Sequence, residues 1–147
     1  TVNITCVDDW SQNFSTNLDS RKIFKSNLKK FLNKDISLQI IEKDFRKVNF
    51  KNIKNINIYF YDGPHHYEDH YDAIKLVLPA LTKKFILIID DWNWEQVRKG
   101  TLDSIHNEKL KIVSKLEIKT TTDNSSSLIT GENSDWHQGV AFFVIKK

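Results

Sequence analysis

The chain has 147 residues, of which 39% are hydrophobic and 28% are charged, and its formal net charge is +3. This length fits one domain with a buried core, and the composition is ordinary for a soluble globular protein. The basic residues form no dense run, so we expect no nucleic-acid partner. No apolar stretch approaches the length of a membrane span and no leader pattern is visible, so we expect no membrane partner.

Cys6 is the only cysteine of the chain. It lies in an apolar, strand-like run and has no partner for an internal disulfide, which agrees with a reducing compartment. We therefore expect a cytoplasmic location.

Strand-like and helix-like segments alternate along the chain. In chain order, we predict a strand over 2–7, a helix over 18–33, a strand over 36–41, a helical turn and loop over 45–55, a strand over 56–61, a helix over 67–81, a strand over 85–89, a helix over 94–106, and strands over 112–118 and 140–145. Residues 120–134 are rich in Thr, Ser, Asn and Gly, which is typical of a surface loop or a mobile lid.

This order of elements predicts an α/β fold with a doubly wound, mostly parallel sheet and a C-terminal β-hairpin. No linker, repeat or long low-complexity tract divides the sequence, so we expect residues 1–147 to form one domain. In an open α/β sheet, ligands bind beyond the carboxyl ends of the parallel strands.

Acidic residues stand at those strand ends. Asp62 follows one predicted strand, and Asp90 and Asp91 follow the next one. Carboxylates gathered at one place repel one another unless a cation lies between them, and a hard divalent cation such as Mg²⁺ prefers oxygen ligands of this kind. The alternative is that Asp90 or Asp91 caps the helix predicted to begin near Trp94.

Three histidines, His65, His66 and His70, follow the first of these carboxylates. Because His66 and His70 are four residues apart, on a helix they could share a face and bind a transition metal such as zinc. We favour a single histidine, His65 or His66, as a general base, since the ordinary pKa of histidine lies near neutrality. His137 could also approach the site, whereas we expect His106 at the surface.

Acidic residues also follow the first two predicted strands. An acidic side chain at the position of Asp8 can accept both hydroxyls of a ribose, although Asp8 could equally belong to a turn or a helix cap. Asp44 could offer an acceptor to an adenine amino group, and Phe45 an apolar face to the adenine ring.

Three tryptophans lie beside these acidic residues. Trp92 and Trp94 directly follow the acidic pair and could wall the crevice, and Trp10 could do the same for a cofactor, because aromatic side chains exclude water and stack on rings. Packing in the core or at an interface is the alternative for each of them.

Five segments together form a series of motifs. They are Cys-Val-Asp-Asp-Trp at 6–10, Ile-Glu-Lys-Asp-Phe at 41–45, Tyr-Asp-Gly-Pro-His-His-Tyr-Glu at 61–68, Ile-Ile-Asp-Asp-Trp at 88–92 with Arg-Lys-Gly at 98–100, and Trp-His-Gln-Gly-Val at 136–140. In this series the chain resembles class I S-adenosylmethionine-dependent methyltransferases, and within them the macrocin-type small-molecule O-methyltransferases. The resemblance spans nearly the whole chain.

The resemblance implies a Rossmann-like, seven-stranded sheet and methyl transfer from S-adenosylmethionine to a hydroxyl group of a small molecule, such as a sugar or a polyketide. The residues implied at the cofactor are Asp8, Trp10, Asp44, Phe45 and Asp62. The residues implied at a Mg²⁺ ion, in the metal-dependent members, are Asp62, Asp90 and Asp91. Such a metal would lower the pKa of the acceptor hydroxyl while His65 or His66 takes its proton. A homo-oligomer is left open.

One feature of the family is absent, the glycine-rich loop after its first strand, which closes around the methionine part of the cofactor. The glycines are Gly63, Gly100, Gly131 and Gly139, and no two of them lie closer than 8 residues. In the family the first strand lies between the second and the fourth, so its absence would leave two exposed strand edges. Since the sequence also begins at Thr1 rather than Met, we expect the fold to be N-terminally incomplete and the chain to be the later part of a longer protein.

Two other classes of function stay open. The Asp and His cluster could serve a metal-dependent hydrolase, with metal-bound water as the nucleophile. That reaction would not need Asp8 or the aromatic walls. Alternatively, the chain is a non-catalytic Rossmann-like module that binds a partner or a nucleotide, which the missing glycine loop would favour.

Overall fold

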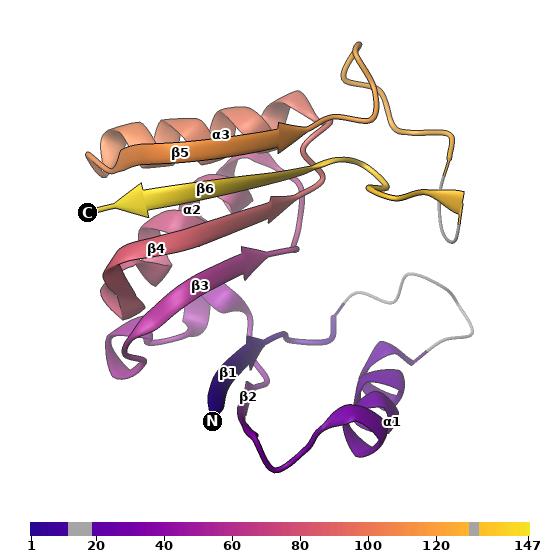
Figure 1. The fold of residues 1–147 in the computed structure, drawn as a ribbon, viewed down its shortest axis with the longest axis vertical. Helices are drawn as coiled ribbons and strands as arrows, with labels where there is room; N and C mark the ends of the chain where they lie inside the picture. Colours follow the sequence, from indigo (N-terminus) through magenta and orange to yellow (C-terminus); the bar gives the residue numbers. More distant parts are fainter. Residues whose placement is uncertain (12–18, 130–132) are drawn as a thin grey trace. The chain divides into compact units, whose positions relative to one another are not determined.

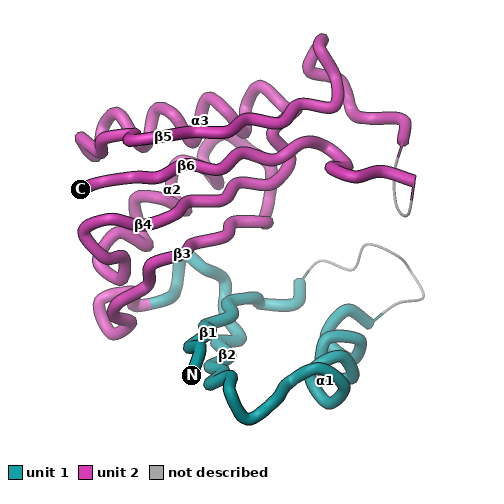
Figure 2. The backbone as a smooth tube through the Cα atoms, in the orientation of Figure 1, with its two compact units in different colours: residues 1–48 teal, residues 49–147 magenta. Residues whose placement is uncertain are grey.

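The computed structural model describes residues 1–11, 19–129 and 133–147. These residues form two compact units, 1–48 and 49–147 (Figure 2), and each unit is described by itself. The expected single domain therefore stays a prediction.

The first unit contains a parallel pair of strands and one α-helix (Figure 1). Its elements are β1 (Val2–Val7), α1 (Ser20–Phe31), β2 (Ile36–Ile41) and the short 3-10 helix η1 (Phe45–Lys47). β1 and β2 are in register from Val2 opposite Ile36 to Val7 opposite Ile41. Parallel strands need a crossover connection, and α1 lies in it. The helix begins after Asp19, whose side chain accepts the Lys22 N–H.

The second unit contains a four-stranded sheet and two α-helices. Its elements are η2 (Phe50–Asn52), β3 (Ile56–Tyr61), α2 (Tyr67–Val77), η3 (Leu78–Ala80), β4 (Leu81–Asp90), α3 (Glu95–Asn107), β5 (Lys111–Ile118) and β6 (Val140–Lys146). The strand order is β3-β4-β6-β5. β3 and β4 are parallel, and β6 is antiparallel to both of its neighbours. The predicted α/β fold and its C-terminal hairpin are thereby confirmed.

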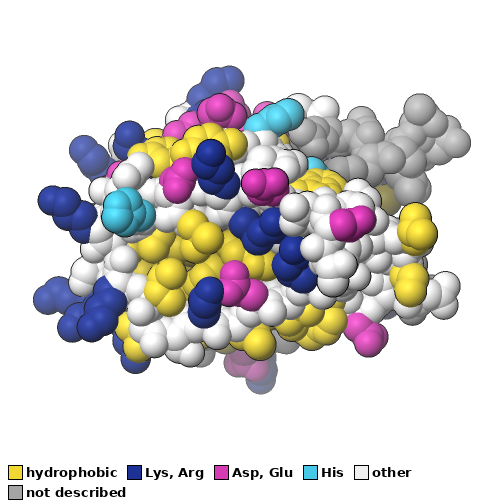
Figure 3. Space-filling model, turned by 90° about the horizontal axis from the view of Figure 1, so that it is seen from above, with side chains coloured by type: hydrophobic (Ala, Val, Ile, Leu, Met, Phe, Trp, Pro, Cys, Tyr) yellow, Lys and Arg dark blue, Asp and Glu magenta, His cyan; other side chains and the backbone are white. Residues whose placement is uncertain are grey.

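The core of this unit lies between the sheet and the pair α2 and α3, which pack together on one face (Figure 1). Strand alternation explains the burial: Phe85, Leu87 and Ile89 of β4 are at most 2% exposed, whereas Ile86 between them is 39% exposed. The opposite face of the sheet therefore keeps apolar side chains at the surface, among them Phe60. Figure 3 looks down on the molecule from the top of Figure 1, where β5 and α3 lie. A group of hydrophobic side chains is exposed on this face, surrounded by charged ones.

The helix predicted over 67–81 is shorter than expected. α2 ends at Val77 because Pro79 has no N–H to continue the helical bonds, and Leu78 to Ala80 form a single 3-10 turn. β4 correspondingly begins at Leu81 rather than at Phe85. Across the described residues, each helix is too short or too polar to cross a membrane.

Candidate functional site

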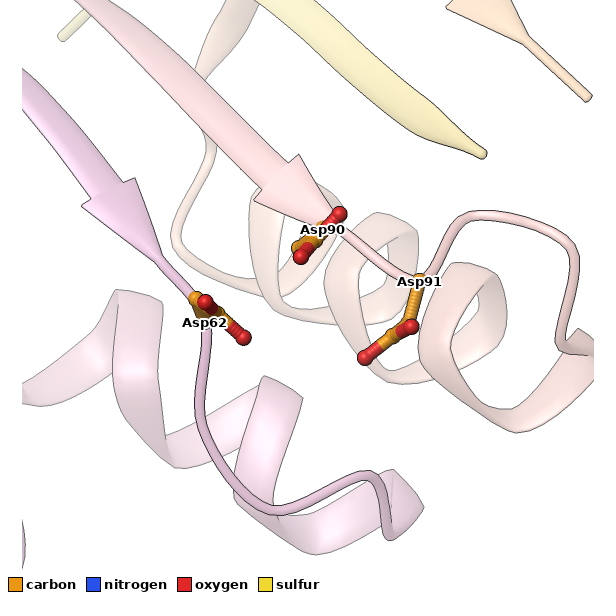
Figure 4. A group of neighbouring side chains, drawn as sticks. All are labelled: Asp62, Asp90 and Asp91. Atoms are coloured by element: carbon orange, nitrogen blue, oxygen red, sulfur yellow. The ribbon is translucent and has the colours of Figure 1, made fainter. Parts of the chain in front are cut away.

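Three carboxylates meet at the ends of β3 and β4. Asp62 directly follows β3, Asp90 is the last residue of β4, and Asp91 comes next (Figure 4). One oxygen of each side chain lies within 4.8 Å of those of the other two. Among the residues that the structure describes, this is the only group of three or more potential metal ligands.

Asp91 is the most buried member of this acidic group. Its backbone is left-handed, with φ 57°, a conformation that Asp tolerates better than most residues. Burial raises the pKa of its carboxyl group, the charges of Asp90 and Asp62 add to that rise, and His65 and His137 oppose it. Positive charge is therefore favoured beside Asp91.

His65 supplies such a partner. Its Nε2 lies 2.7 Å from Oδ2 of Asp91, and its ring packs edge-on against Trp94 with the ring centroids 4.5 Å apart. The His65 side chain is 37% exposed and that of Asp91 10% exposed. When Nε2 carries the proton and donates it to Asp91, Nδ1 has a lone pair with which it can accept another proton.

The neighbouring histidines have other surroundings. His66 is exposed and is the N-cap of α2, where its N–H donates to Oδ2 of Asp69 at 3.1 Å. His70 is 1% exposed and lies edge-on to Tyr61, with the centroids 4.9 Å apart. Because one is exposed and the other buried, the structure does not support the alternative of a zinc-binding pair. His106 is exposed, as expected.

The carboxylates do not cap α3. The N-cap of this helix is Trp94, which makes no capping hydrogen bond with its side chain. The Trp94 N–H instead donates to the backbone carbonyl of Asp91, at 3.2 Å. The carboxylate of Asp91 is thus left to contact His65, and the alternative role as a helix cap does not apply to it.

Of the two alternatives considered for Trp92, a wall of the crevice or packing in the core, the structure shows packing in the core. Trp92 is 0% exposed and packs in the core against Phe143, and its Nε1–H donates to Glu117 at 3.1 Å. Trp94 is half-buried and contacts His65, so it is the one of the two tryptophans at the site.

Sequence reasoning missed a polar junction behind the site. The side chain of Asn93, 0% exposed, donates to Oγ1 of Thr120 at 2.7 Å and accepts the Thr120 N–H at 2.8 Å. The Asn93 N–H donates to the carbonyl of Gln138 at 2.7 Å. Arg98 donates to two carbonyls of the loop after β4 and, at 2.6 Å, to the Asn124 side chain. These bonds anchor the start of the segment predicted as a loop or lid; residues 130–132 of that segment lie outside the described residues.

In the first unit, Asp8 and Trp10 form a turn. Oδ1 of Asp8 accepts the Trp10 N–H at 2.7 Å, which is the turn alternative considered for Asp8. Trp10 has a φ of 59°, and its ring packs against that of Phe24 with the ring centroids 5.2 Å apart. A carboxylate oxygen can accept more than one hydrogen bond, so this turn leaves the predicted ribose contact untested.

Asp44 and Phe45 also have local partners. Oδ1 of Asp44 accepts the Arg46 N–H at 2.9 Å and so caps η1, and its Oδ2 lies 3.9 Å from Nζ of Lys47. The guanidinium of Arg46 lies over the Phe45 ring, 4.6 Å from its centroid. The adenine contacts implied for these two residues stay predictions.

Comparison with known proteins gives a consistent picture. A family model described as a methyltransferase domain matches residues 1–92, more than half of the chain. Three solved structures each match over 97% of the chain. The first is SMU.776, a candidate methyltransferase complexed with SAH, with a TM-score of 0.56, 15% identity and 38% of that chain covered. The second is a candidate methyltransferase from Thermoplasma acidophilum, with a TM-score of 0.56, 13% identity and 56% of that chain covered. The third is a candidate SAM-dependent methyltransferase from Streptococcus mutans, with a TM-score of 0.54, 16% identity and 38% of that chain covered. Among curated proteins, none matches.

These likenesses establish the fold. At identities of 13% to 16% they show a shared Rossmann-like α/β fold and not a shared substrate. The chain spans only 38% to 56% of the length of these three proteins. The narrower resemblance to macrocin-type enzymes stays a prediction.

Proposed function

Because the chain belongs to the methyltransferase domain family, we propose that it forms part of an enzyme that transfers the methyl group of S-adenosylmethionine to a hydroxyl group of a small molecule. One observation carries the choice of a hydroxyl acceptor: His65, half-exposed, lies 2.7 Å from the buried carboxylate of Asp91. A hydroxyl is a weak nucleophile until a base removes its proton, and an Asp-supported histidine suits that task. SAH, bound in one of the similar structures, is the product left when S-adenosylmethionine loses its methyl group.

The reaction needs only a few groups. The hydroxyl oxygen attacks the methyl carbon, the carbon–sulfur bond breaks, and the positive sulfonium becomes a neutral thioether. Nδ1 of His65 takes the hydroxyl proton while Nε2–H donates to Asp91, whose charge stabilises the resulting imidazolium. His66 is the weaker candidate because its backbone caps α2 and its ring is exposed.

Asp62, Asp90 and Asp91 fit a hard divalent cation such as Mg²⁺. Their oxygens lie within 4.8 Å of one another, and burial together with mutual repulsion raises the pKa of Asp91, which a cation would relieve. When bound, such an ion lowers the pKa of a hydroxyl group that it contacts. We include metal assistance in the proposal on these grounds.

The cofactor contacts are part of the same proposal. Asp8 would contact the ribose, Trp10 would wall the cofactor, Asp44 and Phe45 would border the adenine, and Asp62 would border the cofactor at the end of β3. We further propose a cytoplasmic enzyme that acts on a small hydroxylated molecule and binds neither nucleic acid nor membrane. The free thiol of Cys6 agrees with a reducing compartment.

The test uses the natural full-length protein with methyl-labelled S-adenosylmethionine, cell extract and a panel of sugars and polyketide alcohols. We expect label to pass to a hydroxylated acceptor as SAH forms. His65→Gln should lower kcat by about 10²–10⁴-fold with the Kd for S-adenosylmethionine unchanged. His66→Gln is the matched control and should change kcat by less than about threefold. Absence of transfer to any hydroxyl, or full activity of the His65 variant, would overturn the proposal.

Metal and cofactor roles are separated by two more variants. Asp91→Asn should abolish turnover and leave cofactor affinity nearly unchanged, and a chelator should do the same to the unmodified protein until Mg²⁺ is restored. Asp8→Ala should instead weaken cofactor binding, as calorimetry would measure. Equal loss of cofactor binding in the Asp91 variant would contradict the metal role, and an unchanged Kd in the Asp8 variant would remove the ribose assignment.

A further inference from the structure

The loop that carries His65 lies against the last side chain of β3. Tyr61 is 6% exposed and stands opposite Ile89 of β4, so its side chain belongs to the helix-covered face of the sheet. The loop of residues 62–66 then connects β3 to α2. The hydroxyl of Tyr61 donates to the carbonyl of Pro64 at 3.3 Å, so the ring reaches the loop three residues further along the chain.

Gly63 brings the loop into close contact with this ring. A Cβ atom at Gly63 would lie 2.8 Å from both Cζ and the hydroxyl oxygen of Tyr61, and 3.0 Å from Cε2. Such distances are shorter than van der Waals contact, so any larger residue would displace either the ring or the loop. The close approach of Tyr61 therefore favours glycine at this position.

His70 fixes the ring of Tyr61 from within the core. The two rings are 4.9 Å apart and nearly perpendicular, at 85°. His70 is 1% exposed, and neither of its ring nitrogens has a hydrogen-bond partner among the described residues. Burial lowers its pKa to about 4, with the charge of His65 adding to this, so its ring is neutral near pH 7. A neutral ring in contact with Tyr61 acts here by packing and not by charge.

The far end of the loop is fixed independently. The His66 N–H donates to Oδ2 of Asp69, and the Asp69 N–H donates to the carbonyl of His66, both at 3.1 Å. His65 thus lies between two anchored points, the Tyr61 ring at the start of the loop and the N-cap of α2 at its end.

We propose that Tyr61, held by His70, is a positioning residue that sets the path of the loop at Gly63 and Pro64 and so brings His65 to Asp91. The positioning itself follows from the contacts above; its importance for catalysis rests on the proposed function. Tyr61 does not touch the reacting groups in this scheme and acts through His65.

Two variants and one matched control test the proposal on the full-length protein. Tyr61→Phe removes only the hydroxyl, and Gly63→Ala forces the ring and the loop apart. Tyr59→Phe is the control, because the Tyr59 hydroxyl also donates to a backbone carbonyl at 3.3 Å, but to Ala73 on α2. The readout is the pair of ¹⁵N shifts of the His65 ring, which report whether Nε2 or Nδ1 carries the proton.

In the unmodified protein and in Tyr59→Phe we expect His65 protonated at Nε2, as its donation to Asp91 requires. Gly63→Ala should give a mixture of both tautomers and lower kcat by about 10²-fold. Tyr61→Phe, which keeps the ring, should fold even if the Gly63 variant does not, and should lower kcat by about threefold to tenfold. In both variants KM should stay within about twofold.

The outcomes separate the two proposals. Altered His65 shifts in the Tyr61 and Gly63 variants, with Tyr59→Phe unchanged, support the positioning role even if no methyl transfer is found, in which case only the proposed function fails. Unaltered His65 shifts in the folded Tyr61 and Gly63 variants would overturn the positioning role, whether or not the protein transfers methyl groups.

Discussion

The two units of the chain differ in what stabilises them. Figure 2 distinguishes the two units by colour. Among the described residues of 1–48 none is buried, whereas every buried hydrophobic side chain of the described residues belongs to 49–147. β4 alone buries Phe85, Leu87 and Ile89. The first unit therefore keeps its strand register through backbone bonds, with little of the burial that stabilises most parallel strands.

This difference extends to the candidate residues. In the first unit, Asp8 and Asp44 each bind a backbone N–H two residues further along, so their positions depend on local turns. In the second unit, Asp90 is the last residue of β4, whose buried side chains form part of the core, and Asp91 comes next. His65 lies within a loop that is anchored at both ends. The acidic and histidine residues of the second unit therefore have a rigid support, whereas the cofactor residues implied in the first unit have a local one.

The largest effect on stability is expected when a phenylalanine is replaced by alanine in the second unit, and the same substitution in the first unit is its control. Phe143 is 1% exposed and Phe31 is 65% exposed. We expect Phe143→Ala to lower the free energy of unfolding by about 3–5 kcal/mol, because it leaves a cavity in the core. Phe31→Ala should change it by less than about 0.5 kcal/mol. Urea unfolding followed by tryptophan fluorescence measures both, and similar losses in the two variants would show that the units share one core.

Acid should weaken the second unit through His70. All five histidines lie in 49–147. In the folded chain the pKa of His70 is lowered by burial to about 4, whereas unfolding returns it to about 6.5. Between these values the unfolded chain binds more protons, so stability falls as the pH is lowered, by up to about 3 kcal/mol.

The comparison for this prediction is His70→Leu against His106→Leu, measured by urea unfolding at several pH values between 4 and 7. The first variant should lose most of the pH dependence in that window, because it has no group to protonate in the core. The second replaces an exposed histidine and should retain the dependence. A His70 variant with the full slope of the unmodified protein would assign the acid sensitivity to another group.

A smaller loss of stability is expected from a substitution at Gly139, which lies just before β6 and close to Asn93. Gly139 has φ +84°, and a Cβ there would lie 2.6 Å from the Ile118 carbonyl oxygen and 2.8 Å from Oδ1 of Asn93. Gly139→Ala should therefore destabilise the protein by about 1–3 kcal/mol, through backbone strain and through displacement of the Asn93 side chain. A calorimetric melt measures this, and an unchanged Tm would mean that the junction adapts without cost.

Much of the fold was predictable because the short strands have clear ends. The expected ranges 2–7, 36–41 and 56–61 coincide with β1, β2 and β3, each a β-prone segment rich in apolar residues and bounded by polar ones. β4 begins earlier than expected because Lys83 and Lys84 interrupt its apolar pattern, although the strand itself continues through them. Sequence patterns report burial, and exposed strand residues leave no such signal.

The site was only partly predictable, for a similar reason. Adjacent parallel strands bring their ends together, so the meeting of Asp62 with Asp90 and Asp91 follows from topology. The choice of His65 over His66 depends on the path of one loop. The role of Asn93 depends on Thr120, 27 residues away, which no local pattern reveals. Whether Trp92 lines the crevice or packs in the core stayed open, because a tryptophan has the same identity in a sequence in either place.

The smallest effect tests whether charge replaces burial in the first unit. Arg21 of α1 makes two hydrogen bonds to the carboxylate of Glu42 after β2, and the side chains are 46% and 40% exposed. An exposed ion pair of this kind contributes about 0.2–1 kcal/mol, and salt screens it. A double-mutant cycle with Arg21→Gln and Glu42→Gln should give a coupling energy in that range, falling as salt is raised from 50 mM to 500 mM. A coupling well above about 1 kcal/mol that persists in salt would mean that this pair is shielded from water. The contrast between a unit stabilised by its core and one lacking buried side chains would then need revision at the junction of α1 and β2.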